Sequence, residues 1–128
     1  MTHEYSNPRS ENHANWLSQV KRGVLELCIL NLLAHQAMYG YQIVKRITSI
    51  PGLVLSEGTI YPLLSRLKGQ GLIVSELIES PQGPARRTYV LTSAGKRHLE
   101  LINHGWQDVV HAVDACAKIP LAERESQT

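Results

Sequence analysis

The sequence is poor in aromatic residues and cysteine, and it has no long apolar run. Its 128 residues contain no Phe, 5% aromatic residues and two cysteines, so a hydrophobic core must consist mainly of Leu, Ile and Val. Cys28 and Cys116 both lie among apolar residues, which fits buried thiols in a reducing cytosol better than a disulfide scaffold. No segment approaches the ~20 apolar residues of a membrane-spanning helix, and the polar N-terminus lacks the apolar stretch of a signal peptide. We therefore expect a cytoplasmic protein with no membrane partner.

Sequence signatures of catalysis are absent as well. The chain has no nucleophile elbow, no Gly-rich phosphate loop and no paired-cysteine zinc spacing. His104, Asp108 and His111 would share one helix face and are metal-ligand types. Without ligands from a second helix, this trio favours a solvated polar face over a metal site. We expect no enzyme, no cofactor and no bound metal.

The positive charge of the chain is concentrated in its middle. The formal net charge is only +2, but residues 45–97 contain eight basic residues against three acidic ones, and the rest of the chain is net negative. A local excess of positive charge is typical of surfaces that contact phosphates. The distribution therefore indicates a nucleic-acid partner more strongly than the total charge does.

The chain is predicted to form one DNA-binding domain followed by one long helix. Residues 1–14 are polar and are expected to form a disordered arm, with Asn15 capping a helix that begins at Trp16. Tyr41 begins a second helix, which Pro51 stops. The domain would span residues 15–92, the long helix residues 93–118, and a flexible tail residues 119–128.

Residues 56–92 predict a helix followed by a basic hairpin. Ser56 could cap this helix, and its buried stripe would consist of Ile60, Leu63, Leu64 and Leu67. Two strands, at residues 72–79 and 87–91, would be joined by the Pro/Gly turn at 80–84. A helix with a polar outer face next to a basic hairpin is how a winged helix-turn-helix meets DNA. The predicted fold is therefore mainly α, with a small two-stranded β-wing and a long C-terminal dimerisation helix.

Candidate DNA contacts lie on the polar face of that helix and on the wing. Arg66 is the candidate base reader, because a guanidinium can bind guanine through two hydrogen bonds. Arg86 and Arg87 alternate across a strand, so one of them should face the DNA backbone in either register. The alternatives are an ordinary solvated helix face and edge-strand charges that prevent aggregation. The full set is Ser56, Thr59, Tyr61, Ser65, Arg66, Lys68, Arg86 and Arg87.

The last helix carries a regular apolar seam. Its members step alternately by three and four residues, which is the spacing of a coiled coil and predicts pairing with a second copy of the chain. Trp106, in the middle, either packs within this seam or forms one wall of a pocket for a planar ligand. The seam consists of Leu99, Ile102, Trp106, Val109, Val113 and Cys116.

Five stretches together carry a resemblance to a known family. They are KRGVLELCILNLL (21–33), MYGYQIVKRI (38–47), SEGTIYPLLSRLKGQGLI (56–73), GPARRTYVLT (83–92) and the helix through Trp106. In this combination the chain resembles the PadR family of bacterial transcription regulators, in its short form with a single C-terminal helix. Ala85 and Thr88 depart from the usual wing sequence of that family, so the wing contacts follow less directly than those of the helix.

The resemblance implies a homodimer whose last helices cross, with two recognition helices in successive major grooves of a pseudo-palindromic operator. It also implies a repressor, often of its own gene or of a neighbouring transporter or detoxification gene. In some members a flat aromatic effector lies between the subunits beside a tryptophan, and Trp106 matches that position. Carried over by position, the DNA-facing residues are Tyr41, Ser56, Thr59, Tyr61 and Arg66, with Arg86 and Arg87 on the wing.

Two other classes of function fit the same sequence. A winged helix can use its DNA-binding face to bind a protein, and the modest net charge permits this. The chain could also be a ligand or metal sensor whose specificity lies in the seam of the last helix. A DNA affinity that falls steeply with salt would argue against the protein-binding alternative.

Overall fold

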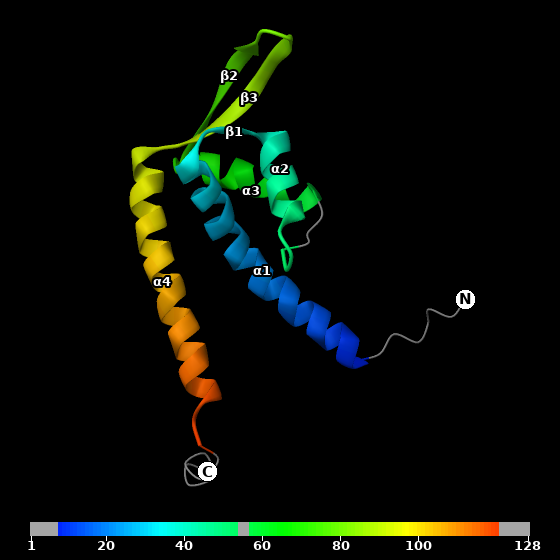
Figure 1. The fold of residues 1–128 in the computed structure, drawn as a ribbon, viewed down its shortest axis with the longest axis vertical. Helices are drawn as coiled ribbons and strands as arrows, with labels where there is room; N and C mark the ends of the chain where they lie inside the picture. Colours follow the sequence, from blue (N-terminus) through cyan, green and yellow to red (C-terminus); the bar gives the residue numbers. More distant parts are fainter. Residues whose placement is uncertain (1–7, 54–56, 121–128) are drawn as a thin grey trace, which may run out of the picture.

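The computed structural model describes residues 8–53 and 57–120, and this part of the chain forms a winged helix with two long helices that extend from it (Figure 1). This confirms the predicted fold class. The elements in chain order are α1 (Pro8–His35), β1 (Met38–Tyr39), α2 (Gly40–Ser49), α3 (Glu57–Gly69), β2 (Ile73–Ser80), β3 (Gly83–Leu91) and α4 (Ser93–Ala117).

The hydrophobic core joins the C-terminal half of α1 to α2, α3 and the beginning of α4. It consists of aliphatic side chains, as the composition predicts, and the apolar stripe of α3 is buried in it. Burial of such side chains is the main force that holds these elements together. The most buried members are Leu25, Ile29, Leu30, Ile43, Ile47, Ile60, Leu64, Leu67 and Ile73.

The sheet has three antiparallel strands in the order β1-β3-β2. β2 and β3 form the predicted wing, although β3 begins at Gly83 and the connecting turn is shorter than expected. β1 is an unpredicted third strand, in which Met38 pairs with Tyr89 and Tyr39 with Thr88. A strand of two residues is too short to show a period-2 pattern, so the sequence did not predict it. It is defined by its pairing with β3.

Helix α1 begins earlier than the sequence analysis predicted. It runs without interruption from Pro8, so residues 8–14 are helical and do not form a disordered arm. Asn15 therefore lies inside the helix and does not cap it. Pro8 is compatible with this start, because a helix tolerates proline in its first turn. Residues 1–7 lie outside the described part of the chain.

Helix α4 is fixed to the winged domain at its N-terminal end. The Thr92 hydroxyl accepts a hydrogen bond from the Gly95 amide at 2.9 Å and donates one to the Gly71 carbonyl at 2.7 Å. A Cβ atom at Gly95 would collide with the Leu72 carbonyl, so only glycine allows this close approach between α4 and the start of β2. The threonine cap and the glycine together set where α4 leaves the domain.

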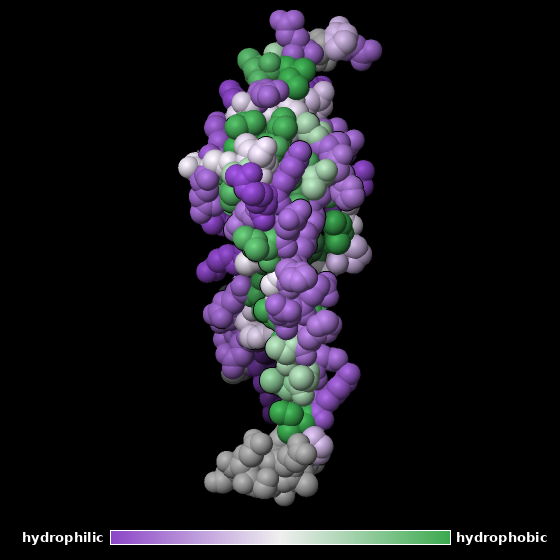
Figure 2. All heavy atoms as spheres, turned by 90° about the vertical axis from the view of Figure 1, so that its left-hand side faces the viewer, coloured by the Kyte–Doolittle hydropathy of each residue, from purple (hydrophilic) through white to green (hydrophobic). Residues whose placement is uncertain are grey.

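Beyond the domain, α4 and the N-terminal half of α1 extend in the same general direction and diverge (Figure 1). Apolar side chains remain exposed on both, among them Trp16, Trp106, Val109 and Val113. Figure 2 shows the side on which α4 lies, where apolar residues gather toward the lower end of the molecule among polar ones. None of the helices in residues 8–53 and 57–120 has the length and apolar character to cross a membrane.

Candidate nucleic-acid interface

The outer face of α3 presents polar side chains to solvent. Thr59, Tyr61, Ser65 and Lys68 are exposed, whereas the apolar stripe on the opposite face is buried. The structure therefore places these four predicted residues together on one accessible helix surface. Ser56, the predicted cap of this helix, lies outside the described residues.

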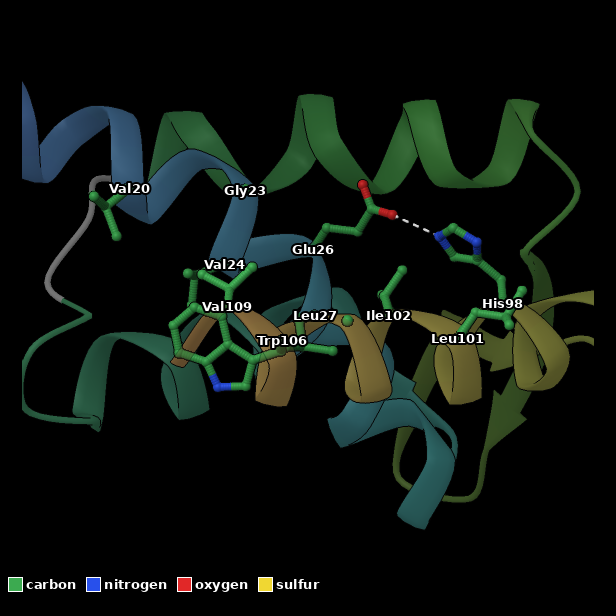
Figure 3. Close-up of a pocket in the computed structure, with 11 residues that line it drawn as sticks. Val20, Gly23, Val24, Glu26, Leu27, His98, Leu101, Ile102, Trp106 and Val109 are labelled. Atoms are coloured by element: carbon green, nitrogen blue, oxygen red, sulfur yellow. Dashed lines mark hydrogen bonds and ion pairs between the residues drawn. The ribbon is translucent and has the colours of Figure 1, made fainter. Parts of the chain in front are cut away.

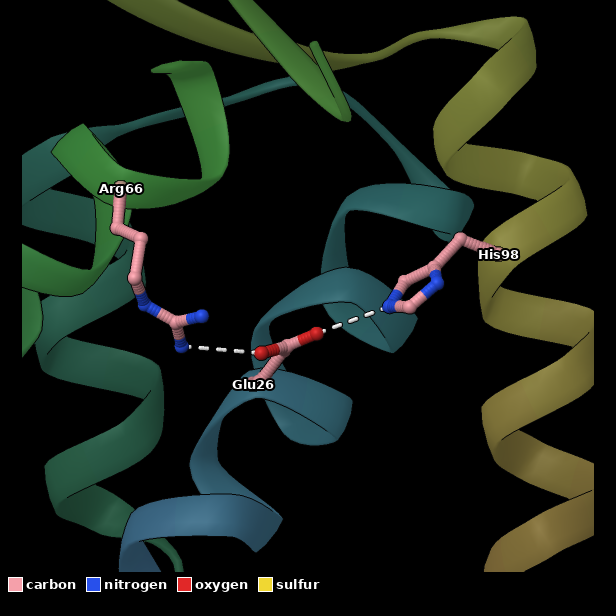
Figure 4. Close-up of polar contacts among 3 residues, drawn as sticks. All are labelled: Glu26, Arg66 and His98. Carbon is pink, nitrogen blue, oxygen red and sulfur yellow. Dashed lines mark hydrogen bonds and ion pairs between the residues drawn. The ribbon is translucent and has the colours of Figure 1, made fainter. Parts of the chain in front are cut away.

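Arg66 points toward α1. Its Nη2 lies 3.0 Å from Oε1 of Glu26, and about half of its side chain (51%) remains exposed. Glu26 also contacts His98 of α4, so one carboxylate joins three helices (Figure 4). The predicted base reader is thus held by an ion pair. This ion pair could not be predicted from the sequence, because Glu26 and Arg66 are 40 positions apart.

The two wing arginines make different contacts. The Arg86 guanidinium lies 5.0 Å from the centroid of the Tyr39 ring, within the range of a cation–π interaction. Arg87 donates a hydrogen bond through Nη1 to the Ser75 hydroxyl on β2 at 2.9 Å. Both arginine side chains are exposed. Both are therefore accessible to an anionic partner.

Tyrosines and arginines from four elements, β1, α2, α3 and β3, lie together at the base of the wing. Gly40 is buried there, and a Cβ atom at this position would lie 3.0 Å from the Tyr61 ring and 3.4 Å from the Tyr89 ring. This glycine lets both rings approach the start of α2. The two rings form part of the wall of a cleft of about 370 Å³, which we call the tyrosine cleft. The residues that line it are Tyr39, Gly40, Tyr41, Tyr61, Arg86, Arg87 and Tyr89.

Tyr39, Gly40 and Tyr89 were missed as site residues. The signal was present in the YGYQI and RRTYV segments, but only the pairing of β1 with β3 brings them together. Phenol hydroxyls and guanidinium groups are both common donors to DNA phosphates. The cleft therefore joins the polar face of α3 to the basic wing as one donor-rich surface, and Lys45 adds a further cation 5.3 Å from the Tyr41 ring centroid.

A second cavity, of about 670 Å³, lies between α1 and α4. Figure 3 shows Trp106 and Val109 toward one end and the Glu26–His98 pair toward the other. The walls are otherwise mainly aliphatic. The residues that line the cavity are Val20, Gly23, Val24, Glu26, Leu27, His98, Leu101, Ile102, Gly105, Trp106 and Val109.

The predicted seam of α4 divides into two parts. Leu99 is buried in the core of its own domain and Ile102 packs against that core, so these two positions are satisfied within one chain. Trp106 is partly exposed at 37%, and Val109 and Val113 are 52% and 63% exposed. Cys116 is also exposed, in contrast to the burial predicted for it, while Cys28 is half-buried.

Charges around Glu26 favour its ionised form. Partial burial by itself raises the pKa of this carboxyl, but hydrogen bonds from His98 and Arg66 and the positive charge of Arg66 outweigh burial and hold the pKa below its usual range. Burial raises the pKa of the Cys28 thiol, which keeps it protonated and unreactive. His104, Asp108 and His111 are exposed, and the described residues contain no cluster of three or more side chains suited to a metal ion.

Comparison with known proteins identifies the family. The sequence profile of the transcriptional regulator PadR-like family matches residues 29–101. The chain belongs to this family. It is 36% identical to a transcriptional regulator of Mycobacterium tuberculosis over 83 residues, which cover 65% of this chain and 76% of that protein. The chain is therefore a DNA-binding transcriptional regulator of the PadR-like family.

Solved structures of PadR-like proteins share the fold. A PadR-like transcriptional regulator from Bacillus cereus matches with a TM-score of 0.72 and 34% identity, over 80% of this chain and 99% of that chain. A PadR family regulator from Eggerthella lenta matches with a TM-score of 0.76 and 27% identity, over 88% of this chain and 97% of that chain. The surface formed by α3 and the wing is therefore the candidate DNA-binding face of a PadR-like regulator.

Proposed function

We propose that the protein is a dimeric repressor that binds a pseudo-palindromic operator in the cytoplasm and is released by a small aromatic effector. The observation that carries this proposal is the continuous exposed surface formed by the polar face of α3, the tyrosine cleft and the basic wing. In a winged helix, such a helix enters the major groove while the wing contacts the backbone. Exposed residues that support these roles are Tyr41, Thr59, Tyr61, Ser65, Lys68, Arg86 and Arg87.

Dimerisation is supported by the exposed apolar residues of α4. Trp106, Val109 and Val113 continue the three–four spacing beyond the point where α4 leaves its own domain. A contiguous apolar surface of this kind is costly to leave in water and marks an interface. A second copy is the proposed partner, because a symmetric dimer would present two α3 helices to two half-sites about 34 Å apart.

An effector site is supported by the cavity between α1 and α4. Its volume of about 670 Å³ is in the range of small-molecule sites, and its walls combine apolar residues with a few polar groups. Trp106 offers a ring face on which a flat aromatic molecule could stack. A ligand that binds more tightly when the two α3 helices have one spacing would shift the dimer toward that spacing. The size of the shift is set by the difference in ligand affinity, and DNA occupancy changes with it.

Fluorescence anisotropy with the DNA upstream of the protein's own gene tests the proposal. A scrambled duplex and several salt concentrations should be compared, together with a variant in which Arg86 and Arg87 are both alanine. We expect tighter binding to the upstream DNA and a log–log salt slope that is shallower by about 0.9 for each phosphate that the variant no longer neutralises. Equal, salt-insensitive binding of both duplexes would contradict the proposal.

A second candidate function is protein binding through the wing. Leu77, Ile78 and Val74 on β2 are 65%, 45% and 43% exposed, although β2 is an edge of the sheet. Exposed apolar residues on an edge strand favour contact with another polypeptide. Replacement of Leu77 by Thr would leave DNA affinity unchanged and would weaken such a protein contact, which distinguishes the two functions.

A further inference from the structure

Glu26 of α1 connects α3 to α4. Its Oε1 lies 3.0 Å from Arg66 Nη2 on α3, and its Oε2 lies 2.9 Å from His98 Nε2 on α4. An ionised carboxylate only accepts hydrogen bonds, so the His98 contact requires a hydrogen on Nε2. Each oxygen has its own partner, and both contacts exist at once (Figure 4).

The same pair forms the polar end of the cavity between α1 and α4. Glu26 and His98 both line it, on the side away from Trp106 (Figure 3). The Glu26 side chain is only 19% exposed, whereas Arg66 is 51% exposed. A displacement of α4, or a ligand that contacts this end of the cavity, would therefore change the surroundings of the carboxylate that holds Arg66.

The contacts of Arg66 do not maintain the fold. The core beneath α3 is formed by Ile60, Leu64 and Leu67, each of which is fully buried. An ion pair with one half-exposed partner contributes little to stability. A guanidinium released from Glu26, in contrast, is a strong donor to a phosphate or to guanine. The geometry thus favours a role for this pair in positioning Arg66.

We propose that Glu26 is a positioning residue that restrains Arg66 and makes its availability to DNA depend on the position of His98 and α4. The inference rests on the proposed DNA-binding function. It assigns to Glu26 the link between the α1–α4 cavity and the recognition helix. It predicts that changes at His98, on α4, alter DNA affinity only through Glu26.

A double-mutant cycle in DNA affinity tests the link. Glu26→Leu removes both acceptor oxygens and keeps a side chain of similar size, and His98→Phe keeps a ring but removes the donor. We expect His98→Phe to change the Kd by at least about threefold in the wild-type background and to have no effect in the Glu26→Leu background. Equal effects of His98→Phe in both backgrounds would overturn the proposal.

The salt dependence shows whether Arg66 is the group released. In Glu26→Leu the log–log salt slope should steepen by about 0.9, the value of one additional phosphate contact, and Arg66→Ala in that background should reverse the change. Glu100→Gln is the charge-matched control, because Glu100 is exposed on α4; it should leave the slope unchanged. The same steepening in Glu100→Gln would mean that only net charge matters, and it would overturn the proposal.

Two measurements distinguish a failure of this inference from a misfolded variant and from a failure of the proposed DNA-binding function. Thermal unfolding of each variant verifies folding, and Glu26→Gln, which keeps one acceptor oxygen, should give an intermediate salt slope if Glu26→Leu is too unstable to use. The NMR signals of the Arg66 guanidinium report the link without DNA: His98→Phe should change them only when Glu26 is present. Absence of DNA binding by the wild type with this change intact would reject the proposed function and not the link, whereas Arg66 signals that His98→Phe leaves unchanged would reject the link.

Discussion

Asn31 on α1 and Asn103 on α4 exchange two side-chain hydrogen bonds. Nδ2 of Asn31 donates to Oδ1 of Asn103 at 3.1 Å, and Nδ2 of Asn103 donates to Oδ1 of Asn31 at 3.0 Å. Both side chains are partly buried. Each of these side chains both donates and accepts one hydrogen bond, and both bonds form only at one alignment of the two helices. The pair therefore fixes how α4 lies along α1 next to the cavity.

Loss of one amide should destabilise the protein. Asn103→Ala leaves the Asn31 amide without its partner in a partly buried site, and we expect a loss of about 1–2 kcal/mol in the free energy of unfolding. Gln107→Ala, at an exposed position of the same helix, is the control and should cost much less. Urea unfolding at fixed protein concentration measures both. The double variant Asn31→Ala/Asn103→Ala should lose less than the sum of the single variants, and strict additivity would contradict the pairing.

Gly40 should be required for the tyrosine cleft more than for the fold. An alanine Cβ would lie 3.0 Å from the Tyr61 ring, closer than an ordinary contact, so Gly40→Ala requires that ring to shift by a few tenths of an ångström. We expect DNA affinity to fall by about tenfold, which corresponds to about 1.4 kcal/mol. Gly69→Ala on α3 is the control, because a Cβ atom there would meet nothing within 4 Å, and its DNA affinity should not change. Anisotropy titrations with circular dichroism melts would show whether affinity and stability separate.

The contribution of Glu26 to stability should disappear in acid. Despite partial burial, Arg66 of α3 and His98 of α4 hold the pKa of Glu26 below its usual range. A carboxyl with a lowered pKa in the folded state stabilises the protein above its unfolded pKa of about 4.3, and this stability is lost as pH falls through the folded value. Arg22, one turn earlier on α1, is a further charged group on the same helix.

Wild type and Glu26→Gln should therefore differ near neutral pH and converge in acid. We expect a difference of about 1 kcal/mol or less, because Arg66 is half exposed, and it should vanish once the pH falls below the lowered pKa of Glu26 in the folded protein. Urea unfolding at several pH values measures this difference, with Glu100→Gln as the control. A difference that stays constant from neutral pH down through the lowered pKa of Glu26 would show that the ionised carboxylate is not its source.

The fold could be predicted because its main elements carry local signals. The stripe from Ile60 to Leu67 indicates a helix buried on one face, and the Pro/Gly turn with flanking β-formers indicates the wing. The polar composition of residues 8–14 suggested disorder. This segment contains no helix breaker after Pro8, however, and α1 includes all of it. Polar composition alone therefore misplaced the beginning of α1.

The candidate site was predictable in its surface but not in its contacts. The exposed positions of α3 follow from helix periodicity. The direction of Arg66 depends on Glu26, and the amide pair of Asn31 depends on Asn103 72 positions away. Ion pairs and amide pairs over such separations leave no periodic signal in a sequence, and they arise only when the helices pack. The same holds for Tyr39 and Tyr89, which line one cleft only because β1 pairs with β3.

The exposed part of the α4 seam should control assembly. Val113 is 63% exposed, and it belongs to the part of the α4 seam that is proposed to contact a second copy. Val113→Glu would bring two carboxylates into an apolar contact without partners, which is unfavourable. We expect the dissociation constant of the dimer to increase by at least about tenfold, which corresponds to about 1.4 kcal/mol. Sedimentation equilibrium over a range of concentrations measures this effect.

His104→Glu is the matched control for that experiment. His104 lies outside the seam of α4 and is exposed, so the same added carboxylate should leave the dimer intact. The far-ultraviolet circular dichroism of both variants should remain helical, because Val113 lies outside the core of the winged domain. If Val113→Glu stays dimeric, the copies must associate through another surface, and the N-terminal half of α1 around Trp16, which is 60% exposed, becomes the surface to test. If it becomes monomeric and also loses operator binding, pairing of the α4 helices is required for two copies to bind the two half-sites together.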